Sequence, residues 1–177
     1  HSFPTRRSSD LDLTLKKIPV QVTSTTADVA SIINTIKVYN GANLLDSVDG
    51  SAIVDVNSSV CDSSDTTSVG STGCYIFSNL STPNNMITSG STVEFTVVAD
   101  LKKADGSNYS AGDTLTASVV NGDILLTTNF SVNDMNGDQL TAGSTYRVGS
   151  AIGQIQTLRV NGVNVVMGSP TYSNTTN

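Results

Sequence analysis

The sequence predicts an all-β fold in which two antiparallel sheets pack face to face as a sandwich. From Ser91 to Leu101 apolar and polar side chains alternate almost without a break, and the apolar set is Val93, Phe95, Val97, Ala99 and Leu101. The stretch from Asp113 to Val119 repeats the pattern with Leu115, Ala117 and Val119. Because successive side chains of a strand point to opposite faces, each stretch has one face in a core and one in water. This is typical of antiparallel sandwiches.

Turn dipeptides separate the expected strands. Six Asx-Gly pairs occur along the chain, and Gly after Asn or Asp favours the positive φ angles of a tight hairpin turn. Three of these pairs, Asn40-Gly41, Asn121-Gly122 and Asn161-Gly162, have apolar residues on both sides. They predict hairpins that join Ile36/Val38 to Leu44/Leu45, Val119/Val120 to Ile124/Leu126, and Leu158/Val160 to Val163/Val165.

The first predicted strand changes phase. Leu11, Leu13 and Leu15 are odd-numbered, whereas Ile18, Val20 and Val22 are even-numbered. A slip of one residue moves the apolar set to the other face, so the register must be reset near Lys16 and Lys17 by a bulge or by a crossing between sheets. Pro19 lacks an N–H and favours an edge strand.

The remaining elements are shorter. Val29, Ile32, Ile33 and Ile36 are spaced as on a helix after Asp28, but β-branched residues and the following hairpin favour a strand, and both alternatives stay open. Further strands are expected at 52–56, 74–78 and 152–160.

The domain boundaries follow from the ends of the chain. Residues 1–11, HSFPTRRSSDL, resemble the conceptual translation of a sequencing adapter and are set aside as a non-native segment. Residues 12–168 are expected to form a single domain, and residues 169–177 a linker or the start of a next module. The chain is accordingly expected to be a metagenomic fragment of a longer protein.

Composition excludes several classes of partner. Charged residues make up 14% of the chain and the net charge is -6, whereas nucleic-acid binding needs cations that neutralise phosphates. The chain has no run of about 20 apolar residues such as a membrane helix requires. We therefore expect neither nucleic acid nor direct membrane contact by this segment.

The only two cysteines, Cys61 and Cys74, bracket a polar loop rich in Ser, Thr, Asp and Gly. A disulfide across this loop would remove conformational entropy from the unfolded chain and stabilise the fold by roughly 3 kcal/mol. Disulfides form in oxidising compartments, so the pair predicts an extracellular or cell-surface location.

The residue inventory argues against catalysis. His1, the only histidine, lies within residues 1–11, and paired cysteines offer no nucleophile. The aspartates follow no pattern that marks a matched acid and base. We expect a non-enzymatic protein with no catalytic residue and no required cofactor.

Calcium is the one metal that the sequence suggests. Asp134, Asn136 and Asp138 alternate oxygen-bearing side chains around Gly137, as in the first half of a calcium loop. A hairpin turn at Asn136-Gly137 explains the same residues. A second set of acidic residues, Asp46, Asp49, Asp62 and Asp65, would need the fold to bring it together.

Carbohydrate binding is a further alternative for a sandwich. It relies on exposed aromatic faces, and the chain has no Trp and 5% aromatic residues. The tyrosines, which would have to serve, are Tyr39, Tyr75, Tyr109, Tyr146 and Tyr172.

Three segments carry a resemblance to a known family: TSGSTVEFTVVADL, ADGSNYSAGDTLTASVV and GSAIGQIQTLRV. Together they resemble the immunoglobulin-like modules of repetitive bacterial cell-surface proteins. The resemblance implies an immunoglobulin-like sandwich that acts as a spacer, stalk or adhesive element beside neighbouring modules, a cell-surface protein or a glycan. A calcium- or carbohydrate-binding surface module and a subunit of a filament joined through strand edges are the alternatives.

Overall fold

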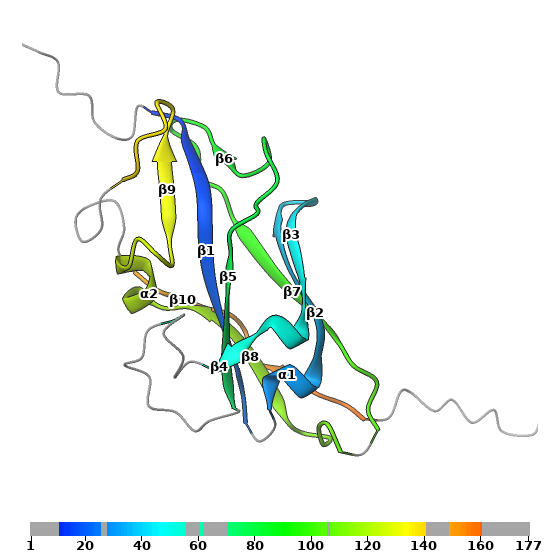
Figure 1. Ribbon diagram of the computed structural model, residues 1–177. Coiled ribbons are helices and arrows are strands. Elements are labelled where there is room, and N and C mark those ends of the chain that lie inside the picture. The colour runs from blue at the N-terminus through cyan, green and yellow to red at the C-terminus, as the bar shows by residue number, and fades with distance from the viewer. Residues whose placement is uncertain are drawn as a thin grey trace, which may run out of the picture.

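A computed structural model describes residues 11–25, 28–55, 61, 71–105, 107–140 and 149–160. Their strands form two antiparallel sheets that face each other without closing into a barrel, which confirms the predicted sandwich (Figure 1). The larger sheet has eight strands, five of them side by side in the order β10-β8-β1-β5-β4, while β11 pairs with β8 and both β6 and β9 pair with β1. The smaller sheet has the order β3-β2-β7.

The elements have the following bounds. In the first half of the chain they are β1 (Leu13–Ser24), α1 (Val29–Ile32), β2 (Ile33–Asn40), β3 (Asn43–Asp49), the 3-10 turn η2 (Gly50–Ala52), β4 (Val54–Asp55) and β5 (Thr72–Phe77). In the second half they are β6 (Met86–Ile87), β7 (Phe95–Leu101), β8 (Thr114–Val119), α2 (Asn121–Leu125), β9 (Ser131–Asp134), β10 (Ala151–Ile152) and β11 (Gln156–Thr157). No helix within these described ranges is long and apolar enough to cross a membrane.

The central strand β1 contains the predicted register reset. Its pairing with β9 shifts between Leu15 and Lys17, which marks a β-bulge. The Nδ2 of Asn85 donates to the carbonyl of Leu15 at 2.9 Å, and the Leu15 N–H donates back to the Asn85 carbonyl at 2.9 Å. These bonds hold the chain beside the bulge, so apolar residues on either side of it remain buried although their numbering changes from odd to even.

Pro19 does not lie in an edge strand, so that prediction is wrong. Pro19 is buried in the middle of β1 and pairs with Ile76 of β5. On the other edge of β1, the pairing with β9 ends at Lys17 and the pairing with β8 begins at Gln21. Pro19 therefore falls in the gap between two partner strands, where a missing N–H interrupts no ladder.

Only part of the hairpin prediction is confirmed. β2 and β3 form the first hairpin, turning at Gly41 with φ +56°. The second hairpin is wrong, because Asn121–Leu125 forms the single helical turn α2. The third lies largely outside the described residues. Between Asp28 and Ile33 both open alternatives occur in sequence: Asp28 caps the one-turn helix α1, and β2 begins directly after it.

The core lies between β1 and β2 and beneath α1. Its most deeply buried side chains are Leu15, Val20, Val29, Ile32, Ile33, Ile36, Val38 and Phe77. The alternation predicted for β7 has the correct phase, since Phe95 and Val97 pack against the core and Thr96 is exposed. Residues toward the end of β7 depart from it: Leu101 is 39% exposed and Ala99 is exposed, and both line a groove.

Other predicted strands are shorter than expected. The stretch 52–56 contributes only β4, because Gly50 to Ala52 form η2. Gly50 lies so close to β2 that a Cβ would be 2.0 Å from the carbonyl oxygen of Ile33. The stretch 152–160 divides into β10 and β11 around Gly153, whose N–H donates to Ala117 at 2.8 Å.

Candidate functional site

The outer face of the larger sheet carries the only place in the described chain where three His, Cys, Asp or Glu side chains converge. Gln21 of β1 and Cys74 of β5 are direct partners in the antiparallel register, so their side chains lie on one face. The neighbouring residues Val20 and Val22 point to the core instead. Both faces of β1 are therefore covered, and Gln21 is only 2% exposed.

Cys61 and Cys74 form a disulfide on this face, as the sequence predicts. Their Cα atoms are 6.3 Å apart, and both residues are buried against Ile76 of β5. The bridge closes a loop with a sequence separation of 13. It ties Cys61, which lies outside any strand, to the middle of the sheet. Such a bridge stabilises the fold chiefly by restricting the unfolded chain.

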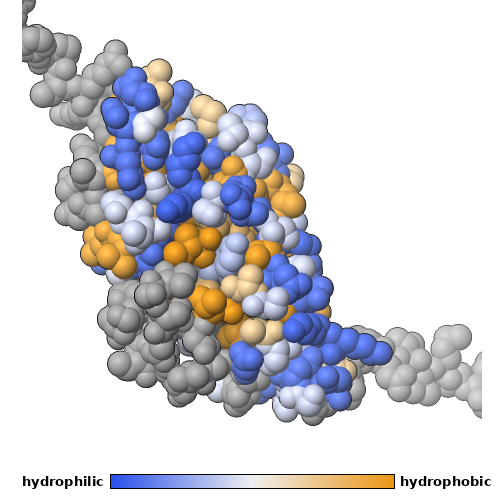
Figure 2. All heavy atoms as spheres, in the orientation of Figure 1, coloured by the Kyte–Doolittle hydropathy of each residue, from blue (hydrophilic) through white to orange (hydrophobic). Residues whose placement is uncertain are grey.

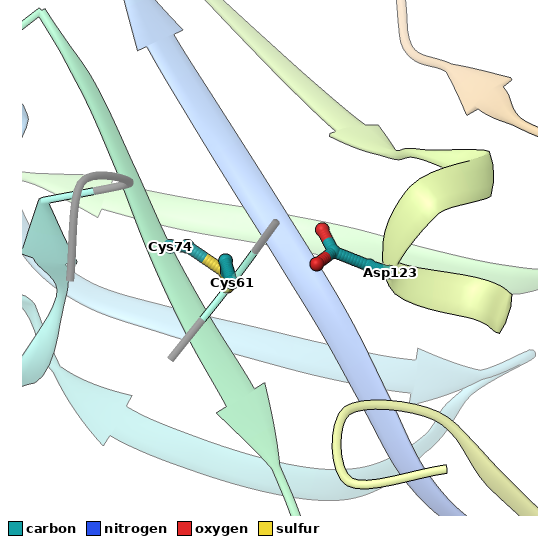
Figure 3. A group of neighbouring side chains, drawn as sticks. All are labelled: Cys61, Cys74 and Asp123. Atoms are coloured by element: carbon teal, nitrogen blue, oxygen red, sulfur yellow. A yellow bond between two sulfur atoms is a disulfide. The ribbon is translucent and has the colours of Figure 1, made fainter. Parts of the chain in front are cut away.

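Asp123 faces the disulfide on the same face of the sheet. It comes from α2, which follows β8 on one edge of β1, whereas Cys74 belongs to β5 on the other edge. Figure 3 shows its carboxylate extending from α2 toward the two sulfurs. One carboxylate oxygen accepts a hydrogen bond from Nε2 of Gln21 at 3.1 Å, and the other accepts one from Nδ2 of Asn129 at 3.0 Å. Asp123 has no exposed surface. We call these five residues, Gln21, Cys61, Cys74, Asp123 and Asn129, the Asp123 cluster.

The chemistry of the Asp123 cluster depends on the state of its sulfur atoms. A disulfide offers neither a thiolate nucleophile nor a thiolate ligand. In this state the cluster is a structural contact in which two amide groups satisfy a buried carboxylate. Within 4.8 Å of one another, however, lie one ligand atom each from Cys61, Cys74 and Asp123.

Sequence reasoning missed three members of this cluster. The dipeptide Asn121-Gly122 indicated an exposed hairpin, which placed Asp123 on the surface. Gln21 stands between Val20 and Val22, and simple alternation assigns it to a wet face. The one usable sign was a lone amide residue within the otherwise apolar run from Ile18 to Val22.

The candidate calcium residues lie together in an exposed turn after β9. One oxygen of the Asp134 carboxylate accepts backbone hydrogen bonds from Asn136 at 2.8 Å and Asp138 at 3.0 Å, and Gly137 has φ +89°. The Asp134 side chain therefore closes its own turn, which is the turn alternative that the sequence left open. Calcium binding at this turn stays a prediction.

The second acidic set is not assembled by the described residues. Asp46 and Asp49 lie on β3, where each accepts from a nearby backbone N–H, Asp46 from Ser47 and Asp49 from Ser51. Asp62 and Asp65 lie outside the described residues, as does His1.

The described tyrosines serve packing or backbone contacts. The rings of Tyr75 and Phe77 meet edge to face with centroids 4.9 Å apart. The hydroxyl of Tyr109, a residue only 9% exposed, donates to the carbonyl of Lys102. Tyr39 is half-buried on β2, and Tyr146 and Tyr172 lie outside the described residues. Carbohydrate binding stays a prediction without a described aromatic platform.

A groove of about 820 Å³ opens between β7 and β8. Apolar side chains line most of it, among them Phe95, Val97, Leu101, Leu115 and Ala117. On the face of the molecule drawn in Figure 2, apolar side chains lie in separate patches among hydrophilic ones.

Three exposed aspartates have lowered pKa values. Lys37 of β2 donates to Asp100 of β7 at 2.5 Å, and this bond, followed by one from Thr35, lowers the pKa of Asp100. The pKa of Asp49 is lowered by hydrogen bonds from Ser51. Hydrogen bonds from Ser107, first from its backbone N–H, lower the pKa of Asp105. All three carboxylates are thereby stabilised in the charged form.

Comparison of the chain with protein-family models, curated proteins and solved structures finds no match.

Proposed function

We propose that this domain is a non-enzymatic structural module of an exported cell-surface protein, where it acts as a spacer, stalk or adhesive element in line with neighbouring modules. The observation that carries the proposal is the path of the chain. β1 starts at one end of the molecule, and the orange stretch that closes the described chain leaves at the other (Figure 1). A module with this path extends a stalk by its own length.

The pairing of β1 supports a load-bearing role. From Leu13 to Ser24 every residue except Lys16 pairs with at least one neighbouring strand, and all the pairings are antiparallel. Hydrogen bonds in such ladders run perpendicular to the strands. A pull along β1 therefore loads many bonds in shear at once instead of opening them one after another. The disulfide fits the oxidising surroundings of an exported protein.

Stretching single molecules with attachments at the two ends of the chain tests this function. We expect one abrupt unfolding event whose force exceeds that needed when the attachment is moved from the N-terminal end to Ala42, in the turn between β2 and β3. In the control geometry the load does not enter through β1. Gradual extension without a force peak, or equal forces in both geometries, would count against a load-bearing module.

Calcium binding is the alternative with a structural observation in its favour. A hollow of about 390 Å³, half of it lined by polar atoms, adjoins the turn after β9, and Asp12, Asn133 and Asp134 are among its lining residues. A calcium-binding module would melt several degrees higher in millimolar calcium, and Asp134→Ala combined with Asp138→Ala would abolish that shift. An unchanged melting temperature would rule out this alternative.

A further inference from the structure

We propose that Cys61, Cys74 and Asp123 form a binding site for a thiophilic divalent metal ion, with Zn²⁺ as the best fit, when the disulfide is reduced. The starting point is their convergence. One ligand atom from each residue lies within 4.8 Å of the other two, and all three residues are buried. They come from three separate parts of the chain, so the fold brings them together.

The spacing suits zinc. Bonds of about 2.3 Å to sulfur and about 2.0–2.2 Å to oxygen, in tetrahedral geometry, place the ligand atoms about 3.6–3.8 Å apart. The ligand atoms of the cluster need only small side-chain movements to reach this spacing once the sulfur–sulfur bond is broken. Two thiolates and one carboxylate favour zinc over magnesium or calcium, which bind oxygen-rich sites.

Gln21 and Asn129 supply the supporting contacts that such a site needs. Each donates an amide hydrogen bond to a different oxygen of Asp123. Carboxylates that bind metals in proteins are themselves hydrogen-bonded, so these amide donors are compatible with binding an ion. Bonds of this kind orient a metal ligand and raise its affinity for the ion. In the oxidised protein the same two bonds hold the Asp123 carboxylate, which extends toward the sulfurs (Figure 3).

The reaction that opens the site is a two-electron reduction. A trialkylphosphine and one water convert the disulfide to two thiols, and the phosphine becomes the phosphine oxide. Binding of the metal then releases both thiol protons, and the carboxylate supplies the third ligand. A solvent molecule completes four-coordination. Disulfide and metal exclude each other, so the site reports the redox state of Cys61 and Cys74.

Cobalt(II) is the probe of choice, since thiolate and tetrahedral coordination give it distinctive absorption. The full chain, reduced with a phosphine that is then removed without air, is titrated with Co²⁺. We expect thiolate-to-cobalt charge-transfer absorption and intense visible bands that saturate at one metal per chain and disappear when Zn²⁺ is added. The oxidised protein should give neither. Absence of these bands in the reduced protein overturns the proposal.

The variant Asp123→Asn isolates the carboxylate. Asparagine has the same shape, and Gln21 can turn its amide to pair with it, so the fold should persist, as circular dichroism of the oxidised form would verify. We expect the cobalt affinity of the reduced variant to fall at least tenfold. Glu94→Gln, which changes an exposed carboxylate outside the cluster, is the matched control and should bind like the wild type. Equal affinity for all three proteins would mean that the cysteines bind metal without Asp123, and would refute the site.

A measurement on the unchanged chain keeps the test independent of any variant. A metal that binds only the folded state raises the melting temperature. Zn²⁺ should therefore stabilise the reduced protein but not the oxidised one, while Mg²⁺ should stabilise neither. A reduced protein whose melting temperature does not respond to Zn²⁺ contradicts the proposal, whatever the stretching experiments say of the module's mechanical role.

Discussion

Asp123 is a buried carboxylate that packs on the outer face of the larger sheet. Removing a carboxylate from water is costly unless hydrogen bonds replace those to solvent. Gln21 and Asn129 supply such bonds from β1 and from the segment after α2. The three residues thereby connect the central strand to a part of the chain about a hundred positions later.

Replacing Asp123 tests this connection. In Asp123→Ala the amide donors of Gln21 and Asn129 lose a buried acceptor, which costs about 1–3 kcal/mol for each donor left unpaired. We expect a corresponding loss in the free energy of unfolding, measured by urea denaturation. The exposed control Asp138→Ala should change it by no more than about 0.5 kcal/mol. Equal losses in the two variants would contradict the role assigned to Asp123.

The three aspartates with lowered pKa values predict the response to acid. Their pKa values in the folded protein lie below the pKa of an aspartate in the unfolded chain, which is about 3.9. The unfolded state therefore binds more protons between the two values, and stability rises with pH through that window. We expect the melting temperature to climb from pH 2 to about pH 4 and to level off above it as far as these groups are concerned. Combining Asp49→Asn, Asp100→Asn and Asp105→Asn should flatten the climb; an unaltered slope would show that other groups cause it.

At the scale of the element, the turn η2 depends on a glycine. The chain passes so close to β2 at Gly50 that any Cβ meets the Ile33 carbonyl oxygen. We expect Gly50→Ala to lower the free energy of unfolding by about 1–3 kcal/mol, because η2 must move away from β2. Ser47→Ala, an exposed change on the adjoining strand β3, is the control. Thermal melting of both variants checks this, and a Gly50→Ala protein as stable as its control would show that η2 adapts without cost.

The disulfide that ties Cys61 to β5 leads to a second prediction at this scale. Removing it with Cys61→Ser and Cys74→Ser together restores the loop entropy of the unfolded chain, which costs about 3 kcal/mol. For a chain of this size the melting temperature should fall on the order of 10 °C. Reduction of the wild type in the presence of a metal chelator should give a similar fall. No fall in either case would mean that the bridge contributes nothing to folding stability.

Local patterns predict some elements and not others. The hairpin β2–β3 and the bulge in β1 follow from short-range rules, a glycine turn between apolar runs and a change of phase. The same turn rule fails at Asn121-Gly122, where Asp123 is held by a long-range bond from Gln21 that no local pattern reveals. The disulfide was predictable because only one pairing of two cysteines exists, but its burial beside a carboxylate was not. Alternation likewise gave β7 the correct phase, yet it carries no information on how far apart the two sheets lie at Leu101.

At the scale of the whole molecule, the bridge limits how far the module can be stretched. An unfolded chain spans at most about 3.3–3.6 Å for each residue. The bridge shields the segment between Cys61 and Cys74, with its sequence separation of 13, from extension. In force-extension curves the oxidised module should therefore lengthen by about 40 Å less on unfolding than the reduced one. Identical lengths would indicate that the bridge is not formed in the protein under load.

The position of β1 also bears on how the protein is made. Within this domain, β1 is synthesised before its partner strands, and these include β8 and β9, which follow about a hundred residues later. A nascent chain that ends before Ser131 lacks the pairing of β1 with β9 from Leu13 to Lys17. The first strand of this domain is thus among the last to be completely paired, and until then its apolar side chains depend on chaperones or on the speed of translation to escape wrong associations.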